Sequence, residues 1–203
     1  MRYALAVAAL FMAAPSLAAP VPKVDTSGAT RCEVPGYLAD TDPGGTNVRA
    51  APDAHAPVIG HLAREYTDPS AKMDFAPEFT IIGSKNGWML IRDAKIGQYG
   101  DKPEKTVYAG PGWISGGLVG FSIGTNSLRS GPAATDKPIA KLVDPDKGYG
   151  PDSFAVKRVH ECRGSAVDVT IVLATDPKAK PLRGWSRHVC SNQVTTCDTG
   201  GED

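Results

Sequence analysis

The chain lacks an excess of charge of either sign. It carries 22 basic and 22 acidic residues, and no block of lysine or arginine stands out. Proteins that bind nucleic acid through its phosphates carry a basic patch or stripe. The charge balance therefore argues against nucleic acid as a partner.

Long uninterrupted segments are scarce as well. The sequence contains 22 glycines and 17 prolines, so few segments run for ten residues without a helix-breaking residue. From residue 30 onward, short apolar segments such as 79–82 and 88–91 alternate with turn sequences such as Asn86-Gly87. This spacing predicts an all-β protein, either a barrel or a sandwich.

Catalytic signatures are absent too. The sequence has no phosphate-binding loop and no H-E-x-x-H motif. A Cys–His pair drawn from His160, Cys162, His188 and Cys190 is the remaining material for nucleophilic catalysis. We expect these cysteines to be paired, which leaves no thiolate, and we therefore predict that the chain is not an enzyme and needs no cofactor.

One apolar run stands at the N-terminus. Residues 3–14 follow the basic Arg2, and small residues lead up to Ala18 and Ala19. This pattern predicts a signal peptide at 1–19, because the run is shorter than the ~20 residues that a membrane span needs. An uncleaved anchor is the alternative. We expect a periplasmic or secreted protein that does not span the membrane after cleavage.

The even number of cysteines fits an exported protein. Two disulfides among four cysteines are favoured over free thiols in an oxidising compartment. The four cysteines are Cys32, Cys162, Cys190 and Cys197.

The sequence also repeats itself. Four segments of the first half recur in the same order in the second half, which indicates a duplication. The pairs are 47–52 with 127–132, 59–62 with 139–142, 82–87 with 159–164, and 112–113 with 184–185. The predicted organisation is a signal peptide (1–19), a flexible leader (20–29), a first barrel with two inserted loops (30–122), a second, diverged barrel (123–198) and a tail (199–203).

The repeated segments resemble the bacterial SH3 (SH3b) pattern. The resemblance rests on 47–52, 58–62, 82–88 and 112–118 of the first copy, and it covers nearly the whole chain beyond the leader. It implies two tandem SH3-like small β-barrels. Residues 47–62 would form the first hairpin of a copy, and a central strand would open at Trp88. A short helical turn would follow Gly112-Trp113. In the second copy, Ala166 stands where Trp88 is expected.

Trp88 is the first candidate binding residue. The resemblance places it beside the groove between the first hairpin and the Asn86-Gly87 turn, where an aromatic ring offers a stiff surface to a peptide or sugar. The alternative is that Trp88 belongs to the core. Trp113 and Trp185 follow glycine in both copies, and we expect both to be core residues that close the barrels.

The insertions supply further candidates. Residues 63–77 and 95–109 are longer than a minimal repeat needs, and long loops on a rigid scaffold often carry specificity. Tyr66, Tyr99 and Tyr108 lie in these insertions as candidate ligand-binding residues.

Two H-x-C units in the second copy have the composition of a zinc site. His160, Cys162, His188 and Cys190 would be neighbours in an SH3-like arrangement, and two histidines with two cysteines suit tetrahedral zinc. The favoured alternative is a Cys162–Cys190 disulfide, which would leave Cys32 to pair with Cys197. The two other pairings remain open.

The resulting prediction of function is an exported, non-catalytic binding module. Peptidoglycan or an envelope protein is the expected partner, recognised through the first barrel. One alternative is a scaffold or inhibitor of another exported protein. A second alternative is a metal-responsive module that uses the two H-x-C units.

Overall fold

The computed structural model describes residues 22–63, 66–68, 73–97, 103–146, 148–193 and 196–197. The predicted signal peptide (1–19) and the predicted tail (199–203) lie outside these residues. The regular elements of the described chain are β-strands and two short 3-10 helices. The prediction of an all-β protein is therefore confirmed.

The first half of the chain holds ten strands among the described residues. They are β1 (Thr30–Leu38), β2 (Thr46–Arg49), β3 (Val58–Leu62), β4 (Tyr66–Asp68), β5 (Met73–Phe75), β6 (Glu78–Lys85), β7 (Trp88–Ile96), β8 (Lys105–Tyr108), β9 (Gly112–Ser115) and β10 (Val119–Gly120), with the 3-10 helix η1 (Gly116–Leu118) before β10.

The second half holds seven described strands. They are β11 (Ser122–Ile123), β12 (Ser127–Arg129), β13 (Pro138–Lys141), β14 (Phe154–Arg163), β15 (Ala166–Leu173), β16 (Leu182–Ser186) and β17 (Val189–Cys190), with the 3-10 helix η2 (Pro151–Ser153) before β14.

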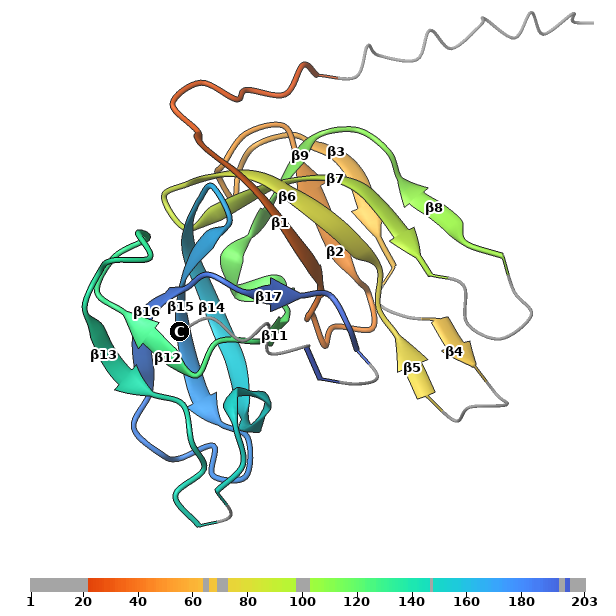
Figure 1. Ribbon diagram of the computed structural model, residues 1–203. Coiled ribbons are helices and arrows are strands. Elements are labelled where there is room, and N and C mark those ends of the chain that lie inside the picture. The colour runs from red at the N-terminus through yellow and green to blue at the C-terminus, as the bar shows by residue number, and fades with distance from the viewer. Residues whose placement is uncertain are drawn as a thin grey trace, which may run out of the picture.

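The two halves repeat one strand order. Hydrogen-bonded neighbours run β10-β1-β6-β7-β9-β2-β3 in the first half and β13-β12-β16-β15-β14 in the second. The series β6-β7-β9-β2-β3 therefore matches β14-β15-β16-β12-β13 strand for strand, and Figure 1 shows the two halves side by side. The register agrees as well, because Arg49 pairs with Trp113 and Arg129 pairs with Trp185.

Local signals in the sequence explain the central hairpin. Asn86 and Gly87 both adopt positive φ, the conformation that a tight two-residue turn requires, and β7 begins directly afterwards at Trp88. The hairpin β6–β7 carries a bulge between Ile81 and Gly83. The hairpin β14–β15 carries the corresponding bulge between Val159 and Glu161.

The sheets differ from the expected barrels in one respect. Closure requires the first and last strands of a sheet to pair. Among the described strands, β10 does not pair with β3, and β13 does not pair with β14. The terminal strands β10 and β13 are short, and β13 begins with Pro138, which has no N–H to donate. The hydrogen-bonded sheets therefore remain open.

Both insertions of the first half contain strands. The segment 63–77 carries the hairpin β4–β5, and the segment 95–109 carries β8, which pairs back onto β7. Tyr108 at the end of β8 packs its ring on Gly60 of β3, where a Cβ atom would overlap it. The second insertion thus covers the edge of the first sheet.

A single apolar cluster fills both halves. It includes Val34 and Ile81 from the first half and Leu128, Val159 and Ile171 from the second, each no more than 1% exposed. The strand β14 packs against β1, β6 and η1. The halves therefore share their core.

Backbone and side-chain bonds reinforce this junction. The N–H of Glu33 donates to the Gly164 carbonyl (2.8 Å), and the N–H of Gly164 donates to the Arg31 carbonyl (3.2 Å). Ser84 Oγ accepts from the N–H of Cys162 (2.9 Å) and donates to the Cys162 carbonyl (3.3 Å). The end of β6 is thereby fixed to the end of β14.

The segment before β1 is held in place. It was expected to be a flexible leader, but the N–H of Asp25 donates to the Ala50 carbonyl at 2.7 Å. The indole N–H of Trp113 donates to the Asp25 carbonyl, and Lys85 Nζ donates to the Ser27 carbonyl. Trp113 is fully buried, which confirms its predicted place in the core.

All four cysteines form disulfides, but the predicted pairing is wrong. Cys32 is joined to Cys162, and Cys190 is joined to Cys197. The prediction assumed that the turns bearing Cys162 and Cys190 are neighbours. Instead β1 of the first half packs against β14 of the second, which brings Cys32 to Cys162.

Removing the long-range disulfide is expected to cost more stability than removing the short one. The chain-entropy model gives about 5 kcal/mol for a loop with a separation of 130 residues and about 2.5 kcal/mol for a separation of seven. Urea unfolding of the Cys32→Ala/Cys162→Ala and Cys190→Ala/Cys197→Ala variants measures both losses. Equal losses would contradict the assigned pairing, as would non-reducing peptide maps that join Cys32 to Cys197.

The contact between η1 and β14 leaves no room for a side chain at Gly116. A Cβ atom there would overlap the carbonyl oxygen of Val159. Gly116→Ala is therefore expected to lower the unfolding free energy by about 1–3 kcal/mol. Gly117→Ala is the matched control, because its Cβ would lie 3.7 Å from Ser115 Oγ, an ordinary contact. A larger loss for Gly117→Ala in the same melts would refute the tight packing at η1.

Candidate functional site

A polar cleft of about 300 Å³ opens in the described structure where the two halves meet. The segment before β1 and the Asn86-Gly87 turn form one side, and strands β14, β15 and β16 form the other. The lining residues are Gly28, Thr30, Ser84, Lys85, Asn86, Gly87, His160, Glu161, Asp168 and Arg183.

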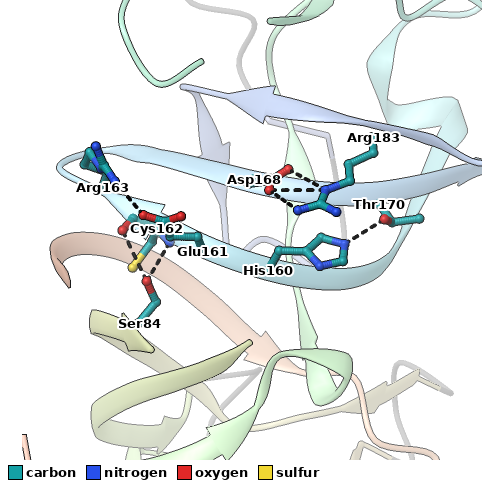
Figure 2. Close-up of polar contacts among 8 residues, drawn as sticks. All are labelled: Ser84, His160, Glu161, Cys162, Arg163, Asp168, Thr170 and Arg183. Atoms are coloured by element: carbon teal, nitrogen blue, oxygen red, sulfur yellow. Dashed lines mark hydrogen bonds and ion pairs between the residues drawn. The ribbon is translucent and has the colours of Figure 1, made fainter. Parts of the chain in front are cut away.

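An ion pair lies in the wall of the cleft that the second half provides. Arg183 Nη2 donates to Asp168 Oδ2 at 2.8 Å, and Arg183 Nε lies 3.3 Å from both carboxylate oxygens. Figure 2 shows this pair on neighbouring strands, β15 and β16. The Asp168 side chain is 11% exposed, whereas that of Arg183 is 60% exposed. The pair thus joins a buried carboxylate to a guanidinium that reaches solvent.

His160 lies beside this pair. Its Nε2 is 2.8 Å from Thr170 Oγ1, and both side chains are drawn close to Arg183 in Figure 2. Burial lowers the pKa of His160, and the positive charges of Arg183 and Arg158 lower it further, while Asp168 partly offsets them. His160 therefore favours its neutral form more than a solvent-exposed histidine does.

The first half has apolar residues in the corresponding places. Leu90 pairs with Trp113 as Asp168 pairs with Trp185, so Asp168 stands where the first repeat has a leucine. Ile82 is the bulged residue of the first hairpin, and His160 is that of the second. The fold is thus built in the first half without these polar groups.

This exchange makes the cluster a candidate site. The Asp168 carboxylate is 11% exposed and loses most of its hydration, and its pair with the 60% exposed Arg183 contributes little to stability compared with well-packed apolar side chains. The second half nevertheless carries Asp168 and Arg183 at positions that the fold fills with Leu90 and Pro111 in the first half. Charged groups at such a position, in the wall of a cleft, are candidates for a binding role.

Two further cations belong to the rim of the cleft. Lys85 Nζ donates to the Ser27 carbonyl at 2.7 Å. Arg158 brings its guanidinium next to Gly87. Glu161 supplies an acidic group, and its carboxylate pairs with Arg163 at 2.8 Å. Charges from both halves therefore surround the cleft.

Trp88 is the residue that follows Gly87 of the cleft lining. It is half-buried. Ala166 opens β15 as Trp88 opens β7, so the second half lacks this ring, as the sequence predicted. Trp185, predicted as a core residue, is half-buried.

Tyr108 is not among the described lining residues of the cleft. Tyr108 donates from its hydroxyl to the Pro111 carbonyl at 2.8 Å, and burial raises its pKa. Its packing on Gly60 gives it a structural role. Tyr66 belongs to β4, where the backbone alone is described, and Tyr99 lies outside the described residues.

The two H-x-C units do not form the predicted zinc set. Cys162 and Cys190 belong to different disulfides, so neither offers a thiolate. His188 is half-buried, and its carbonyl, not its ring, accepts from the Gly124 N–H. No group of three or more potential metal-binding side chains occurs within the described residues.

Sequence reasoning singled out His160 but missed Asp168 and Arg183. A signal was present, because Asp168 is the one charged residue in the apolar strand 166–173. An alignment of the two repeats in the correct register places Asp168 at the position that Leu90 occupies in the first repeat.

A comparison of the chain with family models, curated proteins and solved structures finds no match. The cleft is therefore interpreted from its own geometry.

Replacing Arg183 is expected to raise the pKa of His160. Arg183→Ala removes a nearby positive charge, so the pKa should move towards its ordinary value of 6.5. An NMR titration of the imidazole signals measures the shift, with Arg163→Ala as the matched control. A pKa that stays the same or falls in Arg183→Ala would contradict the arrangement.

The same lowered pKa sets a pH dependence of stability. Between the folded and the unfolded pKa, the folded state binds fewer protons at His160 than the unfolded state does. The contribution of this residue to stability should therefore decline as the pH falls below 6.5.

Proposed function

We propose that this protein is an exported, non-catalytic binding module that takes its ligand in the cleft between the two repeats. Peptidoglycan or an envelope protein is the proposed partner. The observation that carries the proposal is the exchange of Leu90 in the first repeat for the buried Asp168, with its partner Arg183, in the second.

Export is supported by the disulfides of the structure and by the N-terminal residues of the sequence. Both disulfides fit an oxidising compartment. The basic and apolar residues at 2–14 have the pattern of a signal peptide, from which we propose a periplasmic or secreted location. No helix among the described residues has the length and apolar character to cross a membrane.

A binding role agrees with the chemistry of the cleft. Nucleophilic catalysis by cysteine needs a thiolate next to a base, and every cysteine is in a disulfide. The imidazole of His160 bonds to Thr170 Oγ1, and among the described residues no carboxylate bonds to its other nitrogen, as the orienting group of a catalytic base would. The resemblance to bacterial SH3 domains favours an envelope ligand, by analogy.

A second candidate function is that of a scaffold or inhibitor of another exported protein. Ile139 on the edge strand β13 is 50% exposed, and Val58 on the edge strand β3 is equally exposed. A shallow cleft of about 560 Å³ lies along β12 and β13. Exposed apolar side chains on sheet edges are typical of protein–protein contacts.

The two candidates differ in the surface that they use. The cleft between the repeats contains Arg183, whereas the edge of the second sheet contains Ile139. Loss of binding to cell walls in Arg183→Ala but not in Ile139→Ser favours the first candidate. Loss of binding to a purified exported partner in Ile139→Ser but not in Arg183→Ala favours the scaffold or inhibitor.

Purified cell-wall sacculi should pellet the protein from solution. Arg183→Ala and Trp88→Ala are each expected to lower the bound fraction at least fivefold at subsaturating protein, since Arg183 lines the proposed site and Trp88 follows the lining residue Gly87. Arg187→Ala is the matched control, because Arg187 is exposed and bonds to the Pro132 carbonyl away from the cleft. Thermal melts confirm that each variant is folded. Protein that stays wholly in the supernatant would reject peptidoglycan as the ligand.

A further inference from the structure

The guanidinium of Arg183 is oriented by a buried carboxylate. Asp168 accepts from Nε and Nη2, so the pair leaves the Nη1 side of the guanidinium unused. A planar guanidinium that is fixed on one edge presents the remaining N–H groups in a known direction. Because the Arg183 side chain is 60% exposed and lines the cleft, those groups are accessible to a ligand there.

The surrounding charges favour an anion. Lys85 and Arg158 lie at the rim, and Arg183 lies in the wall. Of the two acids, Asp168 is paired with Arg183, and Glu161 is paired with Arg163. The charges of the lining balance, with Lys85 and Arg183 against Glu161 and Asp168, and Arg158 beside Gly87 adds one positive charge.

The behaviour of His160 agrees with this positive charge. After burial, the positive charge of Arg183 is the next largest cause of its lowered pKa, and Arg158 acts in the same direction. An anion bound in the cleft would meet the same two cations.

The cleft also limits the size and charge of its ligand. At about 300 Å³ it lies at the lower end of ligand sites, which suits the last residue or two of a peptide. Glu161 lines the same cleft and repels a group with two negative charges, such as phosphate, more strongly than a carboxylate with one. A carboxylate carries one charge and matches two parallel N–H groups of a guanidinium.

We propose that Arg183, held by Asp168 and flanked by Lys85 and Arg158, binds the free C-terminal carboxylate of a peptide in this cleft. This inference rests on the proposed binding function and names the chemical group that is recognised. Asp168 acts as a positioning residue, because it contacts Arg183 and not the ligand. The exposed Asn86 of the turn and Gly28 of the segment before β1 border the cleft where the peptide end would lie.

The test compares peptides that differ at one group. N-acetyl dialanine and its C-terminal amide are titrated calorimetrically into the purified exported protein. Peptide fragments released from sacculi are compared with the same fragments after amidation. The carboxylate form is expected to bind at least tenfold more tightly than the amide. Equal affinity would overturn the inference.

Variants assign the effect to the cluster. Arg183→Ala should abolish the preference for the carboxylate, and Arg183→Lys should retain part of it, since it keeps the charge but not the fork of donors. Arg158→Ala breaks no buried pair. It should weaken binding of the carboxylate peptide by about threefold to tenfold and leave binding of the amide unchanged. Arg187→Ala should change nothing. A preference that survives in both Arg183→Ala and Arg158→Ala would refute the assignment.

Two further arms separate the possible outcomes. Inorganic phosphate that competes as well as acetate would show a general anion site and overturn the carboxylate assignment. If sacculi pellet the protein but the amide binds as tightly as the acid, the proposed function is supported and the carboxylate inference is rejected. Tight binding of the acid without any pelleting would support the carboxylate site and reject peptidoglycan as the ligand.

Discussion

The packing of β1 against β14 is the contact on which the rest of the structure depends. It brings Cys32 to Cys162, allows the Glu33 and Gly164 backbones to bond, and places Ser84 on the backbone of Cys162. The same contact merges the apolar interiors of the two repeats into one cluster. It also decides where the cleft lies, because the Asn86-Gly87 turn can face β14 and β15 only when the sheets meet in this way.

The repeats share a strand order but have diverged in what they present. The first repeat gained β8, whose Tyr108 covers the edge of its sheet, and it keeps apolar residues such as Ile82 and Leu90 at the junction. The second repeat lacks that extra strand and carries His160 and Asp168 instead. The two halves thus share a strand order, while the first places apolar residues at the junction and the second places charged ones there.

The sequence allowed the local structure to be predicted, but not the contacts between the halves. The Asn86-Gly87 turn, the first hairpin and the turn after Trp113 follow from residues that are neighbours in the chain. The disulfide pairing was wrong because it depends on how two sheets pack, which no local pattern encodes. Asp168 was missed because its importance appears only when the bulge at His160 fixes the register against the first repeat.

The return of the C-terminal segment to the first repeat has a consequence for how the molecule can be assembled. Gln193 exchanges hydrogen bonds with both backbone groups of Ala76, so the last described residues complete a surface that begins more than a hundred positions earlier. The surface of the first repeat is therefore complete only when the chain has been synthesised as far as Gln193. A fragment that ends before the second repeat would leave the backbone groups of Ala76 without this partner.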